Sequence, residues 1–384
     1  MVLSTAVLET QFTESFKEKI AGEKDAGMRR LREEAFAVFT EKGFPSQKEE
    51  EWKYTNVAPV AKEAWKIAAM PAGFSSELDE DAVRLLQKFD LERNGFTALN
   101  LAFAEVAVIR IPKDTIIEEP ISFSLKGESG NAYFPHTIVI AEAGSKATLV
   151  GVYDSGDNVF TNAAVQIVVE DNANLTHYRV QKDAQTSYHY GVTEVELGRG
   201  SVYNSTNINL GAEISRHDID VKFNATGAEA WVDGLYMLNE SQHHDTHSSI
   251  DHAVPNCVSH QTYKGVLNDH SHAVFNGKVF VRLDASGTDA YQQNKNLLLS
   301  NDARVDTKPQ LEIFNDDVKC AHGATVGQLE DEELFYLLTR GLPENLARNL
   351  LTYGFAEEII NKIGVESIKN ELDEIVLNRL GTEI

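Results

Sequence analysis

A four-residue motif recurs through the middle of the chain at nearly constant spacing. In each copy a turn-type residue is followed by a small residue, a variable residue and an apolar or small residue, as in Gly144-Ser145-Lys146-Ala147. The small residue of the motif stands at Ser145, Ala173, Ser201, Ala228, Ser271 and Ala303. The first steps between these positions are 28, 28 and 27 residues, and the next step of 43 is long enough to hold two shorter repeats.

A steady period of this length is typical of stacked supersecondary units. In a β-solenoid each turn of the chain passes a tight corner, where a small side chain fits. A β-sandwich would instead place its turns about every 8–12 residues and would need no period. Hairpin signals are also scarce, with Asp233-Gly234 and Asn276-Gly277 as the main candidates. We therefore favour a solenoid over a sandwich.

The pattern of apolar and β-favouring residues divides the chain into three parts. Helical spacing of apolar residues fills the first ninety or so residues, and the run 61–69 also indicates a helix. β-rich runs replace it over about 100–313, and helical spacing returns after residue 327. The sequence thus predicts an N-terminal helical domain (1–98), a β-helix core (99–322) and a C-terminal helical domain (323–384).

The C-terminal helices are rich in apolar residues that helical spacing places on common faces. One stripe contains Leu334, Leu337 and Leu338, and a second contains Leu346, Leu350 and Tyr353. Because these stripes are wide and the segment is short, the helices cannot bury all of them among themselves. We expect the stripes to pack on the end of the solenoid, on a partner protein, or on both.

The formal net charge of −24 makes some partners unfavourable. Such a field repels a phosphate backbone and an anionic membrane surface, so we expect neither nucleic acid nor membrane as a partner. No apolar run is long enough to span a bilayer. The first nine residues lack a basic region followed by a long apolar one, which predicts a cytoplasmic protein.

Sequence motifs of common catalytic sites are missing from the chain. It has no Gly-x-Ser-x-Gly elbow, no Walker phosphate loop and no dinucleotide-binding glycine fingerprint that opens a helix. The two cysteines, Cys257 and Cys320, are too few for a zinc site built on thiolates and form no redox pair. We therefore expect a protein that is not an enzyme.

Histidines gather in one stretch of the predicted core. Seven of the twelve lie within 30 residues, at His243, His244, His247, His252, His260, His270 and His272. Imidazole and carboxylate groups at this density could bind a divalent metal. In a strand, however, neighbouring side chains point to opposite faces, so only some of these rings can converge. The favoured interpretation is a polar outer face or hydrogen-bonded His–Asp ladders between turns, and a metal site is the alternative.

A second group of candidate ligands lies where the repeats end. Cys320 and His322 are two residues apart, so both side chains can point the same way from an extended strand. Thiolate and imidazole are both suitable ligands for iron. An iron–sulfur cluster is held by about four ligands, so a second chain would have to complete such a site. The spacing alone is a weak signal, and it favours a buried structural cysteine.

Several motifs together resemble the SufB/SufD family of iron–sulfur cluster assembly proteins, on its SufD side. The densest match is the run Asp-Asp-Val-Lys-Cys-Ala-His-Gly-Ala-Thr-Val-Gly at 316–327. Further matching segments are 51–55 (Glu-Trp-Lys-Tyr-Thr), 245–246 with 251–252, 273–277 (Ala-Val-Phe-Asn-Gly), 308–313, 334–337 and 340–341. The resemblance spans most of the chain and is densest over 243–356.

The resemblance implies a right-handed parallel β-helix between two helical domains. It also implies a non-catalytic scaffold that pairs with SufB through the solenoids and carries a SufC ATPase on the C-terminal helices. It points to His322, and less strongly to Cys320, as residues that hold a nascent cluster at the SufB–SufD interface. On this view the isolated chain binds no cofactor stably, and the cluster is transient. A homodimer of the isolated chain is left open.

Two rival functions follow from individual residues. A β-helix enzyme that acts on polysaccharide would use paired carboxylates, for which Asp316-Asp317 and Asp245 with Asp251 are candidates. A cupin-like protein would bind metal through the histidine cluster. Tightly held metal would favour the second of these, whereas copurification of an ATPase would favour the scaffold.

Overall fold

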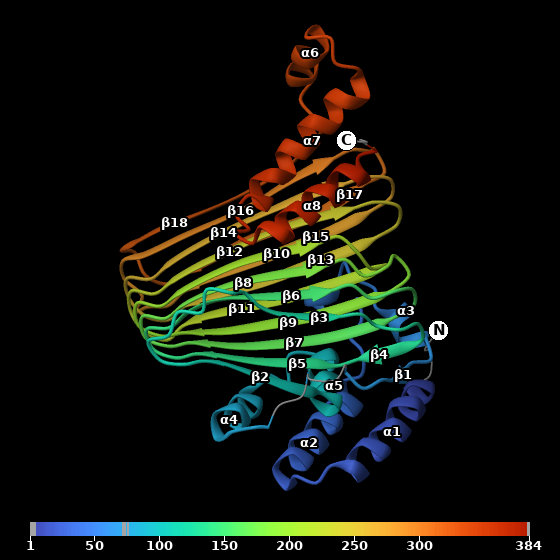
Figure 1. Ribbon diagram of the computed structural model, residues 1–384, viewed down its shortest axis with the longest axis vertical. Helices are drawn as coiled ribbons and strands as arrows, with labels where there is room; N and C mark the ends of the chain where they lie inside the picture. The colour runs from blue at the N-terminus through green and yellow to red at the C-terminus, as the bar shows by residue number, and fades with distance from the viewer. Residues whose placement is uncertain (1–4, 71–73, 75–76, 382–384) are drawn as a thin grey trace.

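The computed structural model describes residues 5–70, 74 and 77–381. The first nine residues were considered above for a targeting segment. Residues 1–4 of that segment lie outside the described residues. Parallel strands form a solenoid of two sheets, with helices at both ends of the chain (Figure 1). The predicted β-solenoid is therefore confirmed, and the sandwich is excluded.

Successive strands of the solenoid alternate between its two sheets, which we call sheet A and sheet B. Sheet A contains β1 (Lys66–Ile67), β2 (Glu105–Ile111), β4 (Asn131–Tyr133), β5 (Pro135–Ala141), β7 (Phe160–Val169), β9 (Tyr188–Leu197), β11 (Ile214–Phe223), β13 (His243–His252), β15 (His272–Val281) and β17 (Arg304–Ile313). Sheet B contains β3 (Ile121–Leu125), β6 (Lys146–Tyr153), β8 (Asn174–Gln181), β10 (Val202–Asn209), β12 (Glu229–Leu238), β14 (Val258–Leu267), β16 (Thr288–Leu298) and β18 (Val318–Gly327). Alternate side chains of both sheets face a shared interior.

Small residues do mark the corners, but the repeat motif combines two different corners. The strand register of sheet B places Ser145, Ala173, Ser201, Ala228 and Cys257 at one corner. Ser271 and Ala303 precede β15 and β17 of sheet A and therefore lie at the opposite corner. The step of 43 residues is thus one full turn to Cys257 plus half a turn, and the expected two short repeats are wrong. Both corners need a small residue, so the local pattern cannot tell them apart.

The N-terminal helices cover the first turns of the solenoid. They are α1 (Thr5–Gly22), α2 (Ala26–Lys42), the short η1 (Glu50–Trp52), α3 (Ala58–Lys62), α4 (Glu80–Lys88) and α5 (Gly95–Phe103). Aromatic residues of α2 and α5 share one apolar core with Phe160 of β7. The helix expected over 61–69 is wrong beyond Lys62, because residues 66–67 pair with β4 as a short strand.

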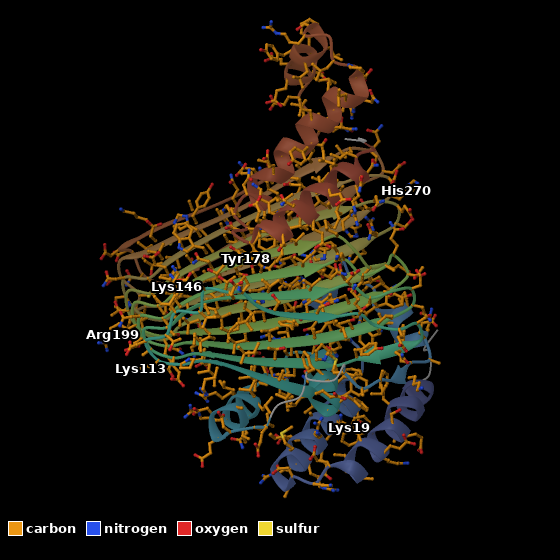
Figure 2. All side chains as sticks on the ribbon, viewed as in Figure 1. Lys19, Lys113, Lys146, Tyr178, Arg199 and His270 are labelled. Carbon is orange, nitrogen blue, oxygen red and sulfur yellow. The ribbon has the colours of Figure 1, made fainter. Side chains whose placement is uncertain are left out.

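The C-terminal helices are α6 (Asp331–Thr339), α7 (Glu344–Ile360) and α8 (Glu366–Arg379). The second half of α7 and the whole of α8 pack on the outer face of sheet B, where Ile359 and Val376 are buried against Ile208. Tyr178 lies under this layer, and its hydroxyl accepts the Gly364 N–H at 2.9 Å (Figure 2). By contrast, α6 and the start of α7 project beyond the last turn (Figure 1).

The boundaries drawn from sequence at 98/99 and 322/323 fall inside secondary-structure elements. The first lies within α5, and the second lies within β18. Helices and strands at the N-terminal end also share one apolar core. The division into three domains stays a prediction.

Candidate functional site

The solenoid ends in an open turn. Among the described strands, β17 pairs only with β15 and β18 pairs only with β16, so each is the last strand of its sheet. Their outer edges present backbone N–H and C=O groups that have no neighbouring strand, which is the usual template for pairing with another chain. Figure 1 shows this edge on the side from which α6 projects.

Cys320 and His322 both lie on β18, on the face that points into the solenoid. Cys320 continues the interior row after Ala290 and packs partly against the main core. His322 continues the row Val232, Gln261 and Gln292. His322 is exposed because no further turn covers it. The two candidate ligands therefore share one face at the open end, as their spacing allowed.

The turn beneath His322 is polar. Gln261, Gln292 and Asn294 are fully buried inside the solenoid. Gln292 Nε2 donates to Gln261 Oε1 at 2.7 Å, but Gln292 Oε1 has no hydrogen-bond partner among the described residues. An unpaired buried acceptor in the turn below His322 is costly in an isolated chain.

Burial controls the chemistry of the Cys320 thiol. Partial burial raises its pKa, and the nearby carboxylate of Asp289 acts in the same direction. The thiol therefore stays protonated near neutral pH, whereas metals bind the thiolate. Cys320 is not an activated ligand in this chain, and a cation supplied at the open end would be needed to deprotonate it.

Exposed apolar residues surround this edge. Phe314 follows β17 and is 58% exposed, and Val326 at the end of β18 is 49% exposed. Ile313 is 41% exposed. Because apolar side chains gather beside unpaired strand edges, the last turn has the character of a protein interface. Sequence analysis missed these three residues, since nothing local shows that no further turn follows.

The helix α6 and the start of α7, which project beyond the last turn, form a second exposed apolar surface. Leu338, Leu346 and Leu350 of the predicted stripes are 37–49% exposed. Phe335 and Tyr336 of α6 are more exposed still, at 66% and 57%, and belong to the same segment. Leu334 and Leu337 are half-buried.

Tyr353 lies differently from the other residues of the predicted stripes. It packs against the apolar core between α7 and sheet B, and its hydroxyl donates to Asp373 of α8 at 3.0 Å. Its role in binding a partner stays a prediction.

The histidine stretch is divided between the two faces of sheet A and the outer face of sheet B. His244 and His252 point inward and bind hydroxyl groups, such as Ser259 Oγ at 2.7 Å from His252 Nε2. Burial lowers the pKa of His244 to about 3 and that of His252 to about 4, so both rings stay neutral. His260 stacks on Trp231 outside sheet B, and His270 is exposed at a corner (Figure 2).

The outward histidines form the expected ladders with carboxylates. His272 Nε2 lies 2.8 Å from Asp306 Oδ2 on the next turn, and His243 Nδ1 lies 3.0 Å from His272 Nδ1. Within the described part of the chain, no three His, Cys, Asp or Glu side chains are grouped to hold a metal ion. The ladder interpretation is therefore confirmed at these positions.

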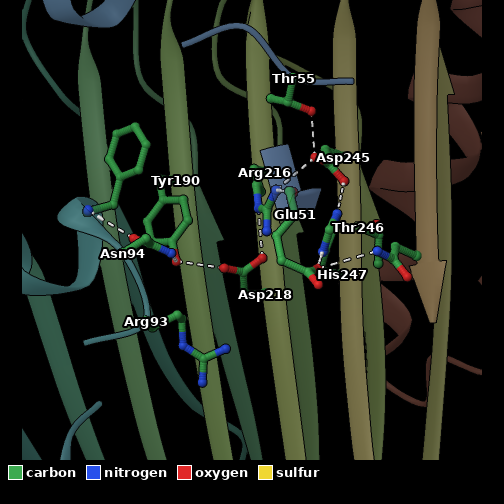
Figure 3. Close-up of polar contacts among 12 residues, drawn as sticks. Glu51, Thr55, Arg93, Asn94, Tyr190, Arg216, Asp218, Asp245, Thr246 and His247 are labelled. Atoms are coloured by element: carbon green, nitrogen blue, oxygen red, sulfur yellow. Dashed lines mark hydrogen bonds and ion pairs between the residues drawn. The ribbon is translucent and has the colours of Figure 1, made fainter. Parts of the chain in front are cut away.

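A buried polar network joins the segment around Trp52 to sheet A (Figure 3). The Arg216 guanidinium lies 3.7 Å from the Trp52 ring centroid and donates to Asp218, to Asp245 and to the Glu51 carbonyl. Thr55 Oγ1 donates to Asp245 Oδ2 at 2.5 Å. Residues nearly two hundred positions apart are thus held together, so the segment 51–55 lies against Asp245 of β13.

His247 sits between two carboxylates in this network. Its Nδ1 lies 3.1 Å from Glu51 Oε2, and its Nε2 lies 3.1 Å from Asp245 Oδ1. Burial and Arg216 lower its pKa, but the two carboxylates outweigh them and the pKa is raised. The hydrogen bond from His247 and the ammonium group of Lys278 in turn lower the pKa of Glu51 to about 2. The site holds charges in place and contains no free nucleophile.

Comparison with known proteins agrees with this geometry. Residues 123–355 match the family described as the SufBD core domain of SUF system FeS cluster assembly, and residues 7–83 match the SufBD N-terminal region. The chain belongs to the SufBD family. It is therefore a protein of SUF-system iron–sulfur cluster assembly, which confirms the resemblance seen in the sequence.

Curated SufBD relatives cover different shares of the chain. A SufBD family protein of Synechocystis is 35% identical over 73% of this chain and 65% of its own length. The Escherichia coli assembly protein SufD is 30% identical over 89% of this chain and 90% of its own length. The Bacillus subtilis SufD is 28% identical over 74% and 67%, respectively.

The two SufBD matches place the polar network at a junction. Trp52 and Glu51 lie in the matched N-terminal region, whereas Arg216, Asp245 and His247 lie in the matched core. One of the two rival carboxylate pairs for a polysaccharide enzyme is occupied here, because Asp245 binds Arg216 and Asp251 binds Arg282. In the described part of the chain, no helix is both long and apolar enough to cross a membrane.

Proposed function

We propose that this SufBD chain is a non-catalytic scaffold subunit that completes a cluster-assembly site together with a SufB-type partner. The observation that carries the proposal is the open last turn, in which an inward-facing Cys–His pair ends the interior of the solenoid. The nascent iron–sulfur cluster is cargo at this edge, held by His322 with Cys320 beside it, and the partner supplies the remaining ligands.

Pairing through the open end has a physical rationale. The edges of β17 and β18 offer unpaired backbone groups, and Phe314, Ile313 and Val326 offer exposed apolar area beside them. A partner solenoid that adds strands here would satisfy both at once. It would also cover His322 and bring a donor within reach of Gln292 Oε1.

A SufC-type ATPase is proposed to bind the projecting helices. α6 and the first half of α7 expose Phe335, Tyr336, Leu346 and Leu350, while the second half of α7 is anchored on sheet B. Movement of an ATPase bound there is transmitted through α7 toward the adjacent open end. Nucleotide-driven pairing of two such ATPases would change the interface between this chain and its SufB-type partner, where the cluster forms.

Replacement of His322 tests this function. His322→Ala is expected to leave pairing with SufB and SufC intact, because its side chain has no hydrogen-bond or ion-pair partner among the described residues, and to slow cluster formation about tenfold or more. Cluster formation is measured by visible absorbance in the assembly reconstituted with iron, a sulfide source and ATP. Cys320→Ala should have a smaller effect, since its thiol is protonated.

His270→Ala is the matched control for this experiment. His270 is exposed at a corner, and its ring lies 3.7 Å from the Asp302 carboxylate. Complex formation is followed by size-exclusion chromatography for each variant. An intact complex in which His322→Ala makes clusters at the unaltered rate would contradict the proposed role of the open end.

A further inference from the structure

A cavity of about 430 Å³ lies where α7 leaves the surface of sheet B. Its floor is formed by the ends of β12, β14 and β16, and its walls are formed by α7 and the end of α8. The apolar part of the lining contains Met237, Leu238, Val266 and Leu299. The polar part contains Asn239, Asn268, Asp269, Arg348, Asn349, Thr352 and Arg379. Cavities of this size and mixed lining are typical of small-molecule sites.

Arg379 lines this cavity as a half-buried cation without an acidic partner. Its guanidinium donates to two main-chain carbonyls, those of Met237 at 2.7 Å and of Leu210. No carboxylate within the described residues forms an ion pair with it, and burial lowers its pKa to about 10. Uncompensated buried charge is costly, so the arrangement is stabilised by any anion that enters.

Other half-buried guanidinium groups of the chain differ from Arg379 in this respect. Arg32 is paired with Glu23, and Arg216 is paired with Asp218 and Asp245. Arg93 is paired with Glu194 and Asp220. Arg179, buried inside the solenoid, also forms no ion pair, but Asn209 and His189 bind its guanidinium. Arg379 differs from it because it lines a cavity that a ligand can enter.

Arg348 supplies a second guanidinium on the α7 wall. Its side chain has no hydrogen bond or ion pair with any described residue, whereas its main-chain carbonyl accepts the Thr352 hydroxyl. Asp269 lines the same cavity, but its carboxylate accepts the Glu240 N–H at 2.9 Å and forms no ion pair with either arginine. Two cations therefore border one apolar-floored cavity without a matching anion.

We infer that this cavity binds a small molecule that carries an oxyanion, a phosphate or a carboxylate, on an apolar body. The planar guanidinium groups of Arg348 and Arg379 match the geometry of either oxyanion. The apolar floor at Met237 and Val266 takes the body of the ligand, and the amides of Asn239 and Asn268 bind polar groups at its edge. A bound ligand touches α7, α8 and sheet B together, so it fixes the angle at which α7 projects.

Isothermal titration calorimetry on the full chain at constant ionic strength tests the inference. Phenyl phosphate and benzoate are the two probes, and inorganic phosphate alone controls for simple charge attraction. The expected result is saturable binding of one organic probe to a single site, tighter than binding of inorganic phosphate. The better probe identifies which oxyanion the site prefers.

Substitutions of arginine residues test whether the organic probe binds in this cavity. Arg348→Met is expected to weaken binding about tenfold or more, because charge-assisted hydrogen bonds are lost while no internal contact is broken. Arg199→Met removes the same charge at an exposed corner (Figure 2) and should leave binding unaltered. Arg379→Lys keeps the positive charge but loses the paired N–H donors of the guanidinium group. It should therefore weaken binding less than Arg348→Met does.

Two results would overturn the inference. The first is the lack of saturation by either organic probe at millimolar concentration in a folded chain, with folding checked by circular dichroism. The second is an equal loss of affinity in Arg348→Met and Arg199→Met, which would show attraction to net charge alone.

Discussion

Single residues in the SufBD chain take their character from the face of the solenoid on which they lie. Adjacent histidines such as His243 and His244 point to opposite sides of β13, so that one meets the Trp52 segment and the other meets Ser215 in the interior. His247 differs from its neighbours because two carboxylates surround it. The protonation states of the histidines along one strand are thus decided by partner residues that come from three different elements.

His247 should make stability depend on pH. The fold raises the pKa of His247. Its contribution to the free energy of unfolding is therefore complete below about 6.5, the ordinary pKa of histidine, and is lost as the pH rises through the raised pKa. His247→Gln is therefore expected to destabilise the chain by about 1.5 kcal/mol at pH 6 and by less at pH 8.5. Thermal unfolding at both pH values measures this.

The other groups that face His247 do not titrate within this window. The pKa of Glu51 is about 2, that of Asp245 is lowered, and that of His243 is about 4 because burial lowers it. His270→Gln, at an exposed corner, is the matched control. A cost of His247→Gln that is equal at both pH values would show that His247 acts through packing alone.

Elements of the solenoid fit together because large and small residues alternate between turns. Tyr263 of β14 stands beside Gly234 of β12, and Tyr236 of β12 stands beside Gly265 of β14. A Cβ atom at Gly234 would lie 2.1 Å from the Tyr263 ring, and one at Gly265 would lie equally close to Tyr236. Both tyrosines are fully buried, so neither ring can move aside.

Gly234→Ala should therefore destabilise the SufBD core. Overpacking of this kind costs about 1–3 kcal/mol, and the rigidity of both turns favours the upper part of that range. Chemical denaturation followed by tryptophan fluorescence gives the change in the free energy of unfolding. The double variant Gly234→Ala/Tyr263→Leu should recover part of the loss.

Gly323→Ala is the control for this glycine, since it also lies in a strand but nothing surrounds its added methyl group within 4 Å. Its effect on stability should be close to zero. If Gly234→Ala proved as harmless as Gly323→Ala, the alternation of glycine and tyrosine would not be what holds these turns in register.

The molecule as a whole has one closed end and one open end. The N-terminal helices cover the first turns with an apolar core, whereas the last turn and the projecting helices leave apolar residues exposed. Because both exposed surfaces lie at the same end, partners that bind them are neighbours (Figure 1).

Substitutions on α7 test the proposed ATPase surface in the complete chain. Leu346→Asp with Leu350→Asp is expected to abolish copurification of SufC while pairing with SufB persists, because both side chains are exposed and belong to α7 and not to the edge strands β17 and β18. Affinity purification of the tagged full chain, with each partner quantified, measures this. Ile116→Asp, at a position that is 62% exposed on the solenoid, is the control. Full recovery of SufC with the double variant would place the ATPase elsewhere.

Features with a local physical cause were predictable from the sequence. The helix that begins after the Asp25 cap and ends at Gly43, with its buried face of Met28, Leu31 and Ala35, follows from capping and helical spacing. The solenoid follows from its repeat, because each corner imposes the same steric demand on the chain. Cys320 and His322 share a face since a strand has a period of two residues.

Other features depend on contacts between distant residues, which no local pattern encodes. The short strand at Lys66–Ile67 exists only because β4 offers it an edge, and the network between Trp52, Arg216 and Asp245 exists only after the N-terminal segment docks on sheet A. Likewise, strand alternation explains why His322 points inward, but its exposure depends on the end of the stack. Spacing along the chain determined the repeating unit of this SufBD protein, and burial by distant segments decided which residues became core, network or open site.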